Sequence, residues 1–327
     1  MRAGVDRLLA SGLVTAGAEV AALEQALVEV VGRRCAVAVD SGTAALTLAL
    51  RLVAAPGDRV AIPAFACASL LVAVRQAGMV PTAWDCDPDT LLLRRSALPA
   101  GCAALVVAHP FGMVEPAVAD DWGRPLIEDI AQSAGAALDG AALGGFGRIA
   151  IASFHATKPW GGAYGGALLL DDAGEAALLR RMVEPDGVAG ELPAGCGHHL
   201  LSDLHALLAR LRIEQADALA AARRRIGRRL AARVEAAGGV VAPGFATGNA
   251  FRLLVRGAHP AEALVARLRA RGVMAARPVQ QPLSRATGDC CPGAEQAFAR
   301  WVSLPLLADC SEEEIARIGQ AVDEAFA

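Results

Sequence analysis

Short apolar runs alternate with longer amphipathic segments through the first half of the chain. The short runs have the length and composition of buried strands, and the segments between them carry apolar residues at helical spacing. The expected strands cover residues 35–39, 59–63, 80–84, 103–109, 124–129, 148–154 and 165–170. Because such alternation is typical of βα units around a largely parallel sheet, the sequence predicts an α/β fold.

The pattern changes after residue 170, where the short strands become sparse. The expected elements there are a helix over 172–183, a loop-rich stretch over 184–197, a long connecting helix over 202–235, strands over 249–257 and 273–279, a helix over 260–272 and two closing helices. Ser311 and Glu314 have the spacing of a capping box at the start of the last helix. We therefore expect a large domain over residues 1–235 and a small C-terminal α+β domain over 236–327.

The composition argues against several classes of protein. Apolar residues make up 54% of the 327 residues, but no uninterrupted apolar run reaches the roughly 18 residues that span a bilayer. The N-terminus lacks the apolar core of a secretory signal, so we expect a cytoplasmic protein with no membrane partner. The net charge of −3 argues against nucleic acid as a partner, and the basic run 222–233 is the pattern of a solvated helix face. The eight cysteines include no C-x-x-C pair, so no metal site is expected.

Lysine occurs only once in the chain, at Lys158, although lysine and arginine together number 31. Both side chains serve as surface cations, but only the lysine amine loses its proton near neutral pH and attacks a carbonyl carbon. Lys158 is therefore a candidate nucleophile. The alternative is a surface lysine left by chance in a composition rich in arginine.

A candidate phosphate site lies in residues 39–46, where a strand ends in Ser-Gly-Thr and turns into an apolar helix. The first N–H groups of a helix are unpaired and lie at the positive end of its dipole, and glycine lets a phosphate approach the backbone. Gly42, Thr43 and Ala44 are the candidates. Taken alone, the motif fits an ordinary helix N-cap better.

A candidate acid lies in residues 125–136, where a buried-looking strand delivers Glu128 and Asp129 at its carboxyl end. Ligands of open α/β sheets bind at such strand ends. The alternative is an aspartate that caps the next turn. Ser153 and His155 lie at the end of the strand that precedes the lone lysine.

Together these motifs supply what pyridoxal 5′-phosphate requires. The cofactor needs a phosphate cradle, a lysine for a Schiff base and an acid that keeps the pyridine nitrogen protonated. The chain has no G-x-G-x-x-G after a first strand and no G-x-x-x-x-G-K-[ST]. The sequence therefore argues against a nicotinamide cofactor and against a nucleotide phosphate loop.

The ordered motifs resemble one family, the fold-type I pyridoxal-phosphate aminotransferases of the DegT/StrS kind, which typically install amino groups on keto sugars. The similarity covers nearly the whole chain and includes "AVAVDSGTAALTLAL", "PGDRVAIPAFACASLL", "IEDIAQSAGA", "SFHATK" and "SDLHALLARLRIEQADAL". The resemblance implies a large domain with a mostly parallel seven-stranded sheet flanked by helices. It also implies a homodimer with shared active sites.

Carried over to this chain, the resemblance implies that Lys158 forms the Schiff base and then moves a proton between substrate and cofactor. It implies that Asp129 pairs with the pyridine nitrogen and that Gln132 lies near the 3-hydroxyl or the ring face. The residues implied to bind the phosphate are Gly42, Thr43, Ala44 and Ser153. His155 either lines the cofactor or has a packing role. Family members with histidine in place of the lysine act as dehydratases, so Lys158 favours transamination.

The chain departs from the family pattern on the substrate side. Tyr164 stands where the family has the glutamate of Gly-Glu-Gly-Gly, and Cys67 replaces an aromatic residue that stacks on the cofactor ring. His198 stands where the family has an asparagine that the neighbouring subunit lends to the phosphate. A tyrosine and a histidine that often contact nucleotide sugars are missing from residues 276–288.

The leading hypothesis is an enzyme, a homodimeric pyridoxal-phosphate aminotransferase. It takes the amino group of an amino acid, L-glutamate, and passes it to a keto or aldehyde acceptor, such as a keto sugar or a natural-product intermediate. The altered substrate side keeps open another carbanion reaction, such as elimination or epimerisation, in a specialised biosynthetic pathway. A third hypothesis, a non-catalytic binding protein on the same fold, is less favoured because the lysine and its acid partner are both present.

Overall fold

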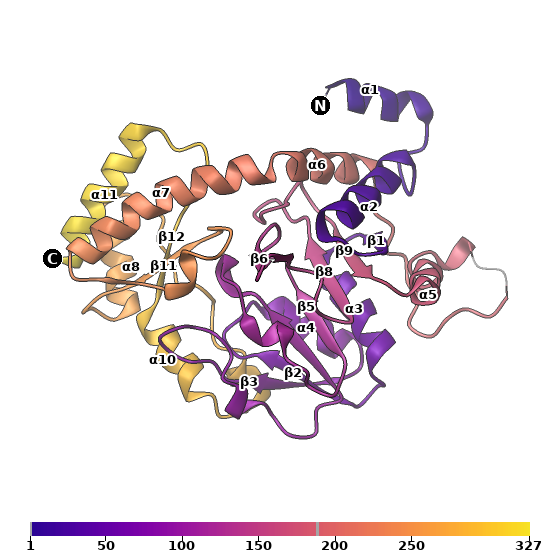
Figure 1. Cartoon of the computed structure of the whole chain (residues 1–327), viewed down its shortest axis with the longest axis horizontal. Helices are drawn as coiled ribbons and strands as arrows, with labels where there is room; N and C mark the ends of the chain where they lie inside the picture. Colours follow the sequence, from indigo (N-terminus) through magenta and orange to yellow (C-terminus); the bar gives the residue numbers. More distant parts are fainter. Residues whose placement is uncertain (1, 188–189) are drawn as a thin grey trace.

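The computed structural model describes residues 2–187 and 190–327, which contain two main β-sheets with their helices and one short hairpin (Figure 1). The larger sheet has seven strands in the order β1-β9-β8-β5-β4-β2-β3. These strands are β1 (Cys35–Val39), β2 (Arg59–Pro63), β3 (Val80–Trp84), β4 (Ala104–Ala108), β5 (Leu126–Asp129), β8 (Ile149–Ser153) and β9 (Gly166–Leu170). All neighbours pair in parallel except β9, which is antiparallel to both β8 and β1. The predicted α/β fold with a mostly parallel sheet is confirmed.

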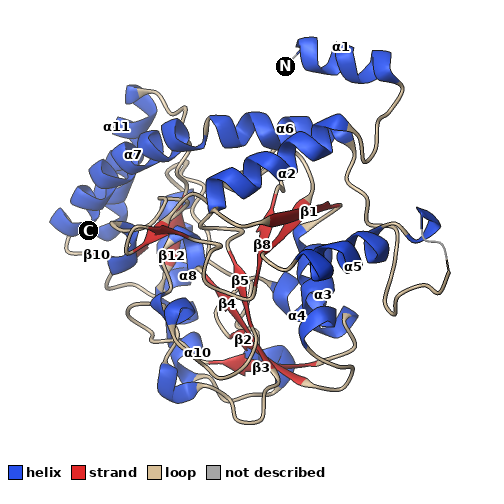
Figure 2. Ribbon diagram, turned by 45° about the vertical axis from the view of Figure 1, so that its right-hand side comes forward, coloured by secondary structure: helices blue, strands red, loops and turns tan. Residues whose placement is uncertain are grey.

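Alternating residue size along the strands distinguishes the two faces of this sheet. In β1 the larger Val37 and Val39 lie on one face, and Ala36 and Ala38 lie on the other. The helices that pack on the valine face are α3 (Gly42–Val53), α4 (Ala68–Gln76) and α5 (Ala173–Val183). Those on the alanine face are α2 (Ala18–Val31) and α6 (Asp203–Glu214) (Figure 2). A short hairpin of β6 (Ala137–Leu138) and β7 (Ala141–Ala142) follows β5.

The long helix predicted over residues 202–235 is broken at one residue into α6 and α7 (Ala216–Ala236). Gln215 lies at the break, and its N–H donates to the carbonyl of Arg212 (3.2 Å), three residues back instead of four. This tightened turn ends α6 before α7 begins. The first helix, α1 (Arg2–Ser11), projects from the body of the molecule and contacts α6 (Figure 1). Neither α7 nor any other helix within the described ranges has the length and apolar character needed to cross a membrane.

The smaller sheet lies in the C-terminal part and is antiparallel throughout. Its strands are β10 (Val240–Val241), β11 (Leu253–Arg256) and β12 (Val302–Leu304), with β11 in the centre. The helices of this part are α8 (Ala261–Arg269), α9 (Ser284–Thr287), α10 (Pro292–Arg300) and α11 (Glu312–Phe326). Ile226, Leu230 and Val234 of α7 pack into the core around this sheet. The connecting helix therefore packs with the C-terminal elements, and the boundary between residues 235 and 236 stays a prediction.

One expected strand of the C-terminal part is wrong, and one expected cap is confirmed. Residues 273–279 form only an isolated bridge, from Ala276 to Ser303, and Pro278 has no N–H to offer a strand ladder. The neighbours of β11 are instead β10 and β12, neither of which the sequence pattern predicted. The capping box forms as expected, because Ser311 Oγ accepts from Glu314 N (3.2 Å) and Ser311 N donates to Glu314 Oε2 (2.8 Å).

Candidate active site

A cavity of about 310 Å³ lies at the carboxyl ends of the parallel strands, where α3 begins. Strands β5 and β8 end at this cavity in Asp129 and Ser153, and the segment after β8 brings Lys158 to it. Seven of the eight site residues predicted from the sequence line the cavity: Gly42, Thr43, Asp129, Gln132, Ser153, His155 and Lys158. The eighth, Ala44, lies outside it. The fold therefore collects in one place side chains that are more than 100 positions apart in sequence.

The start of α3 combines the two alternatives that the sequence left open for it. Ser41 is the N-cap, and its Oγ accepts from Ala44 N (3.1 Å), so that N–H is already used. The N–H groups of Gly42 and Thr43 have no acceptor within the described part of the chain and lie at the positive end of the helix dipole. A side chain at Gly42 would bring its Cβ within 2.8 Å of Ser153 Cβ, so only glycine fits beside β8. The cap and an anion-binding helix start coexist here.

Asp129 is buried in the cavity wall and has no cationic partner among the ion pairs of the described residues. Only 8% of its surface is exposed, and its Oδ1 accepts from Ala131 N (2.8 Å). It therefore caps the next turn, as the alternative interpretation expected, while its other oxygen stays without a protein partner. Burial raises the pKa of Asp129, although the Ala131 N–H and the charge of Lys158 oppose the rise. A buried carboxylate of this kind suits a ligand that brings a positive charge.

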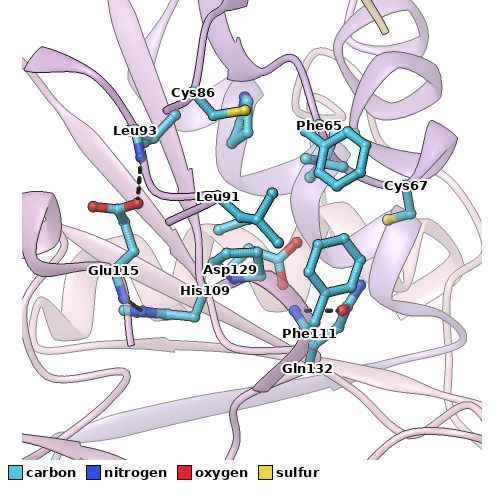
Figure 3. Close-up of a pocket in the computed structure, with 15 residues that line it drawn as sticks. Phe65, Cys67, Cys86, Leu91, Leu93, His109, Phe111, Glu115, Asp129 and Gln132 are labelled. Carbon is cyan, nitrogen blue, oxygen red and sulfur yellow. Dashed lines mark hydrogen bonds between the residues drawn. The ribbon is translucent and has the colours of Figure 1, made fainter. Parts of the chain in front are cut away.

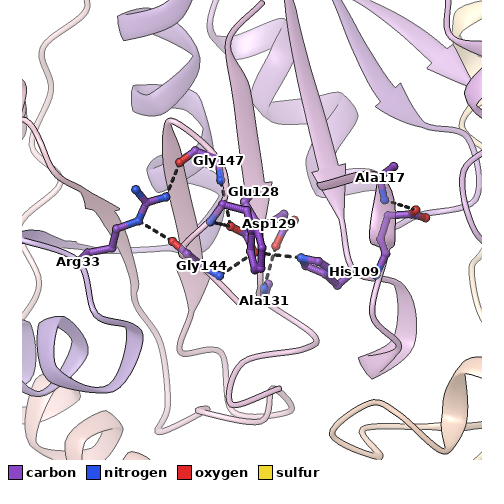
Figure 4. A network of polar contacts seen from close by, with 10 residues as sticks. Arg33, His109, Ala117, Glu128, Asp129, Ala131, Gly144 and Gly147 are labelled. Atoms are coloured by element: carbon purple, nitrogen blue, oxygen red, sulfur yellow. Dashed lines mark hydrogen bonds and ion pairs between the residues drawn. The ribbon is translucent and has the colours of Figure 1, made fainter. Parts of the chain in front are cut away.

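Glu128, the neighbouring carboxylate, has a complete set of protein partners (Figure 4). Its Oε1 lies 3.1 Å from His109 Nε2 and accepts from Gly144 N (2.6 Å), and its Oε2 accepts from the N–H groups of Phe146 and Gly147 (3.0 and 3.2 Å). Burial by itself raises the pKa of Glu128, but the contact with His109 and the backbone N–H groups outweigh it and hold the pKa below its usual range. Glu128 is therefore a structural residue.

Lys158 lies in a tight turn after β8. Its backbone N–H donates to the His155 carbonyl (2.8 Å), and its own carbonyl accepts from Gly161 N (2.8 Å). The Lys158 Nζ lies 5.7 Å from the centre of the Phe251 ring, which comes from the C-terminal part of the chain. Gly162 then passes against α6, where a Cβ would lie 2.5 Å from Ala209 N. The glycines after the lysine thus serve a close backbone contact.

The mouth of the cavity carries an aromatic cluster. Tyr164, the only tyrosine in the chain, is 59% exposed, and its ring meets His155 edge to face at 5.4 Å. His205 from α6 lies 6.3 Å from the same ring. His198 does not line the cavity of this chain and lies 3.8 Å from Asp186 instead.

Cys67 lines both this cavity and a smaller, mostly apolar one, and the two cavities also share Asp129 and Gln132 (Figure 3). The smaller cavity has about 20 Å³ of free space, room for one water molecule. Phe65 and Phe111 line it and meet edge to face at 5.7 Å. An aromatic side chain in place of Cys67 would fill space that the cysteine leaves open.

Two residues that join the C-terminal part to the site are not among those predicted from the sequence. Asn249 is buried, and its Nδ2 donates to the carbonyls of Gln132 (3.1 Å) and Ala134 (3.0 Å). Phe251, two residues later, lies under the Lys158 amine. The signal that could have found the first is rarity, since Asn249 is the only asparagine in the chain, as Lys158 is the only lysine. The segment 130–136 is thereby fixed from both parts of the chain.

These features fit pyridoxal 5′-phosphate. The free N–H groups at the start of α3 suit a phosphate, the unpaired Asp129 suits a protonated pyridine nitrogen, and Lys158 is the only side-chain amine. Within residues 2–187 and 190–327, no group of three or more His, Cys, Asp or Glu could hold a metal ion. The chemistry available at the site is therefore that of an amine, a buried acid and an anion cradle.

Comparison with known proteins gives both a family and close structural relatives. Residues 1–323 match the model of the DegT/DnrJ/EryC1/StrS aminotransferase family. DesI, solved in the presence of its TDP-sugar product, is 26% identical, with a TM-score of 0.89 over 98% of this chain and 88% of DesI. DesV from S. venezuelae is 25% identical, with a TM-score of 0.90 over 99% of this chain and 93% of DesV. The E. coli GDP-4-keto-6-deoxy-D-mannose-3-dehydratase, solved with bound hydrated PLP, shares the fold at 15% identity, with a TM-score of 0.88 over 98% of this chain and 96% of that one.

Proposed function

This chain belongs to the DegT/DnrJ/EryC1/StrS aminotransferase family, and from that premise we propose that it moves the amino group of L-glutamate to a keto or aldehyde acceptor. The enzyme is a pyridoxal 5′-phosphate-dependent aminotransferase. The donor, the acceptor and the roles of individual residues are the proposed part.

The observation that carries the proposal is a single lysine that shares one cavity with a buried acid and a helix start. When bound, pyridoxal 5′-phosphate supplies an electron sink for the negative charge that remains on the substrate carbon after a proton leaves. Lys158 is assigned the removal and return of that proton, because its amine is flexible and can be deprotonated. None of the arginines can substitute, since a guanidinium stays charged.

The other assignments follow from the contacts described above. Asp129 holds a proton on the pyridine nitrogen, because a buried carboxylate favours a cationic partner. The N–H groups of Gly42 and Thr43 anchor the phosphate together with Ser153, which lies against Gly42. Ala44 contributes only through the helix start, since its N–H donates to Ser41.

Gln132 and His155 are assigned supporting roles. The amide oxygen of Gln132 accepts from Phe111 N (2.9 Å), which fixes the side chain at the cavity wall beside the expected 3-hydroxyl. His155 is exposed at the mouth, where its Nδ1 lies 3.0 Å from Thr157 Oγ1. Its contacts support a packing role at the edge of the cofactor site.

A keto sugar or a natural-product intermediate is the proposed acceptor. The likeness to DesI supports a sugar, and the exposed ring of Tyr164 at the mouth offers an apolar face on which a sugar ring can lie. The proposed location is the cytoplasm, because all eight cysteines are free thiols, the state that a reducing compartment maintains.

A homodimer is proposed as the working assembly. Leu9, Leu13 and Val14 are 67%, 67% and 48% exposed near the projecting α1, and such a cluster of exposed apolar side chains favours contact with another protein surface. Light scattering after gel filtration should give a mass near twice 33.5 kDa. A mass of one chain at all concentrations would contradict the dimer.

The experiment that tests the function begins with the absorption spectrum of the purified protein after addition of the cofactor. Wild type should show the visible band of the bound cofactor, and L-glutamate should change it. Lys158→Arg should retain circular dichroism like wild type but lose both signals, because it keeps the charge without an amine that can be deprotonated. A wild-type protein without any visible band would end the proposal.

A second candidate is another carbanion reaction on the same cofactor, such as elimination or epimerisation. Cys67 at the cavity wall favours it, because a stacking ring is absent there, and the E. coli dehydratase shows that the fold is not limited to transamination. The same spectrum separates the two. If no amino donor changes the band of a loaded enzyme, the second candidate replaces the first.

A further inference from the structure

Arg252 lies beside the active site and has no role in the proposed mechanism. It follows Phe251 at the entrance to β11, and its side chain is half-buried. Within the described ranges, no carboxylate lies within ion-pair distance of its guanidinium, and none of its side-chain N–H groups donates a hydrogen bond. Burial lowers the pKa of Arg252, and the nearby Cys67 opposes this shift. An unpaired charge of this kind is costly to keep.

Arg256, at the end of β11, is a nearby arginine that only stabilises the fold and serves for comparison. Its guanidinium lies 5.2 Å from the centre of the Trp301 ring and forms an ion pair with Asp89 (3.0 Å). Arg252 also lies over an aromatic ring, that of Phe251, at 5.3 Å, but without any acid. The difference indicates that Arg252 is kept free for an anion that the chain does not supply.

The ring of Phe251, which both cations contact, limits the distance between Arg252 and Lys158. Lys158 Nζ lies 5.7 Å and Arg252 Cζ lies 5.3 Å from the centre of the Phe251 ring, so the two cations are at most 11.0 Å apart, the sum of those distances. The Arg252 backbone N–H donates to the Phe111 carbonyl (3.2 Å), and the N–H of Phe111 donates to Gln132 in the cavity wall. The backbone of Arg252 is thus fixed next to that wall.

We propose that Arg252 binds a carboxylate of the amino donor while the donor's amine lies at Lys158. This inference rests on the proposed function and names a recognition residue for it. The planar guanidinium matches a carboxylate in a two-pronged hydrogen-bonding geometry, and a partly buried site strengthens the contact. The diphosphate of a nucleotide sugar is the other anion to consider. It carries more charge than one arginine balances.

Calorimetric titration with glutarate, which has the carboxylates of glutamate but no amine, tests the inference without turnover. The cofactor-loaded wild type should bind glutarate. Arg252→Gln should bind it at least about tenfold more weakly, the usual size of a charged hydrogen bond. Arg252→Lys should lie between the two, because it keeps the charge without the fork. The neutral analogue glutaramide should bind equally weakly to wild type and to Arg252→Gln.

Arg256→Gln is the matched control, since it removes a stacked arginine from the same strand whose charge already has a partner. It should bind glutarate like wild type. An unchanged visible spectrum and a melting temperature no lower than that of wild type would show that Arg252→Gln keeps the cofactor site and the fold intact.

Glutarate affinity that does not change in Arg252→Gln would overturn the inference. If thymidine diphosphate affinity falls in the same variant, Arg252 is assigned to the acceptor instead. A wild type that never shows the cofactor band would be a failure of the proposed function itself, and the inference would fall with it.

Discussion

Two neighbouring carboxylates at the end of β5 point to opposite faces of the large sheet and differ in how many protein partners they have. Glu128 points to one face, where a histidine and three backbone N–H groups surround it. Asp129 points to the other face, where the Ala131 N–H is its only protein partner. Arg33 extends the first network, because its Nε donates to the Gly144 carbonyl (2.7 Å) and a terminal nitrogen donates to that of Gly147 (Figure 4).

The difference separates stability from function at two adjacent positions. The folded chain satisfies Glu128 completely, so that residue contributes to the fold with or without a ligand. Asp129 is buried without a compensating partner, which lowers the stability of the fold. A cationic ligand that pairs with Asp129 can restore that stability. Residues that cost stability without an internal benefit are candidates for function.

Asp129→Asn should have the largest effect, and this effect should be on the reaction and not on the fold. The rate at which L-glutamate changes the cofactor spectrum should fall by about 10²–10³-fold, the usual loss when one placed electrostatic contact is removed. The free energy of unfolding of the cofactor-free protein should not decrease, because an unpaired buried charge is removed. Stopped-flow spectroscopy and urea denaturation measure the two quantities. A variant within a few-fold of wild type in rate would contradict the assignment.

Glu128→Gln should destabilise the fold but leave the reaction rate of the folded protein unchanged. The amide nitrogen must face N–H donors in a buried network, so the free energy of unfolding should fall by about 3 kcal/mol. The rate per folded molecule should stay near that of wild type. Glu295→Gln is the control, since Glu295 pairs with Arg285 at the surface (2.6 Å), and it should change stability by less than about 1 kcal/mol. Equal losses in both variants would refute the comparison.

The two carboxylates should also give opposite pH dependence in the cofactor-free protein. The pKa of Glu128 is lowered from 4.5, so its stabilisation is present above pH 4.5 and is lost as pH falls through its folded pKa. The pKa of Asp129 is raised from 3.8, so stability decreases as pH rises from 3.8 through its folded pKa. Urea denaturation across this range should show Glu128→Gln losing the first dependence and Asp129→Asn losing the second. Parallel profiles for both variants would be inconsistent with this account.

Tyr164 lies at the mouth, outside both networks, and its substitution should have the smallest effect. Tyr164→Ala removes an exposed ring whose edge-to-face contact with His155 has a typical free energy of about 0.5–1.5 kcal/mol. We expect the KM for the acceptor to rise by about tenfold or less, with an unchanged rate of the glutamate reaction. Tyr164→Phe should behave like wild type. A loss of the glutamate reaction in Tyr164→Ala would place the ring in the chemistry instead.

The sequence was sufficient for the large sheet and for most of the cavity wall. Strand cores such as CAVAV carry their own periodicity, and the cavity residues follow directly after such strands, so local pattern and strand order predict both. The same reasoning failed at residues 273–279, because Pro278 ends a ladder that the apolar pattern alone suggested.

Contacts between distant segments were beyond the reach of local pattern. The hydrogen bonds from Asn249 to Gln132 and Ala134 span more than 100 residues, and no spacing rule connects them. The same holds for Phe251 beneath Lys158. Successive side chains of a strand point to opposite faces, so different surroundings for Glu128 and Asp129 could be expected. Which of the two has protein partners depends on the loop near Gly144, which local pattern does not place.

The solitary lysine also gives this protein an unusual analytical handle. Apart from the α-amino group of the chain, Lys158 is the only primary amine available to acylating reagents. Intact-mass spectrometry after such labelling would therefore count occupancy of the active centre directly, as one added label or none beyond the label on the α-amino group. The surface arginines would not react with these reagents, so the measurement would need neither a substrate nor a chromophore.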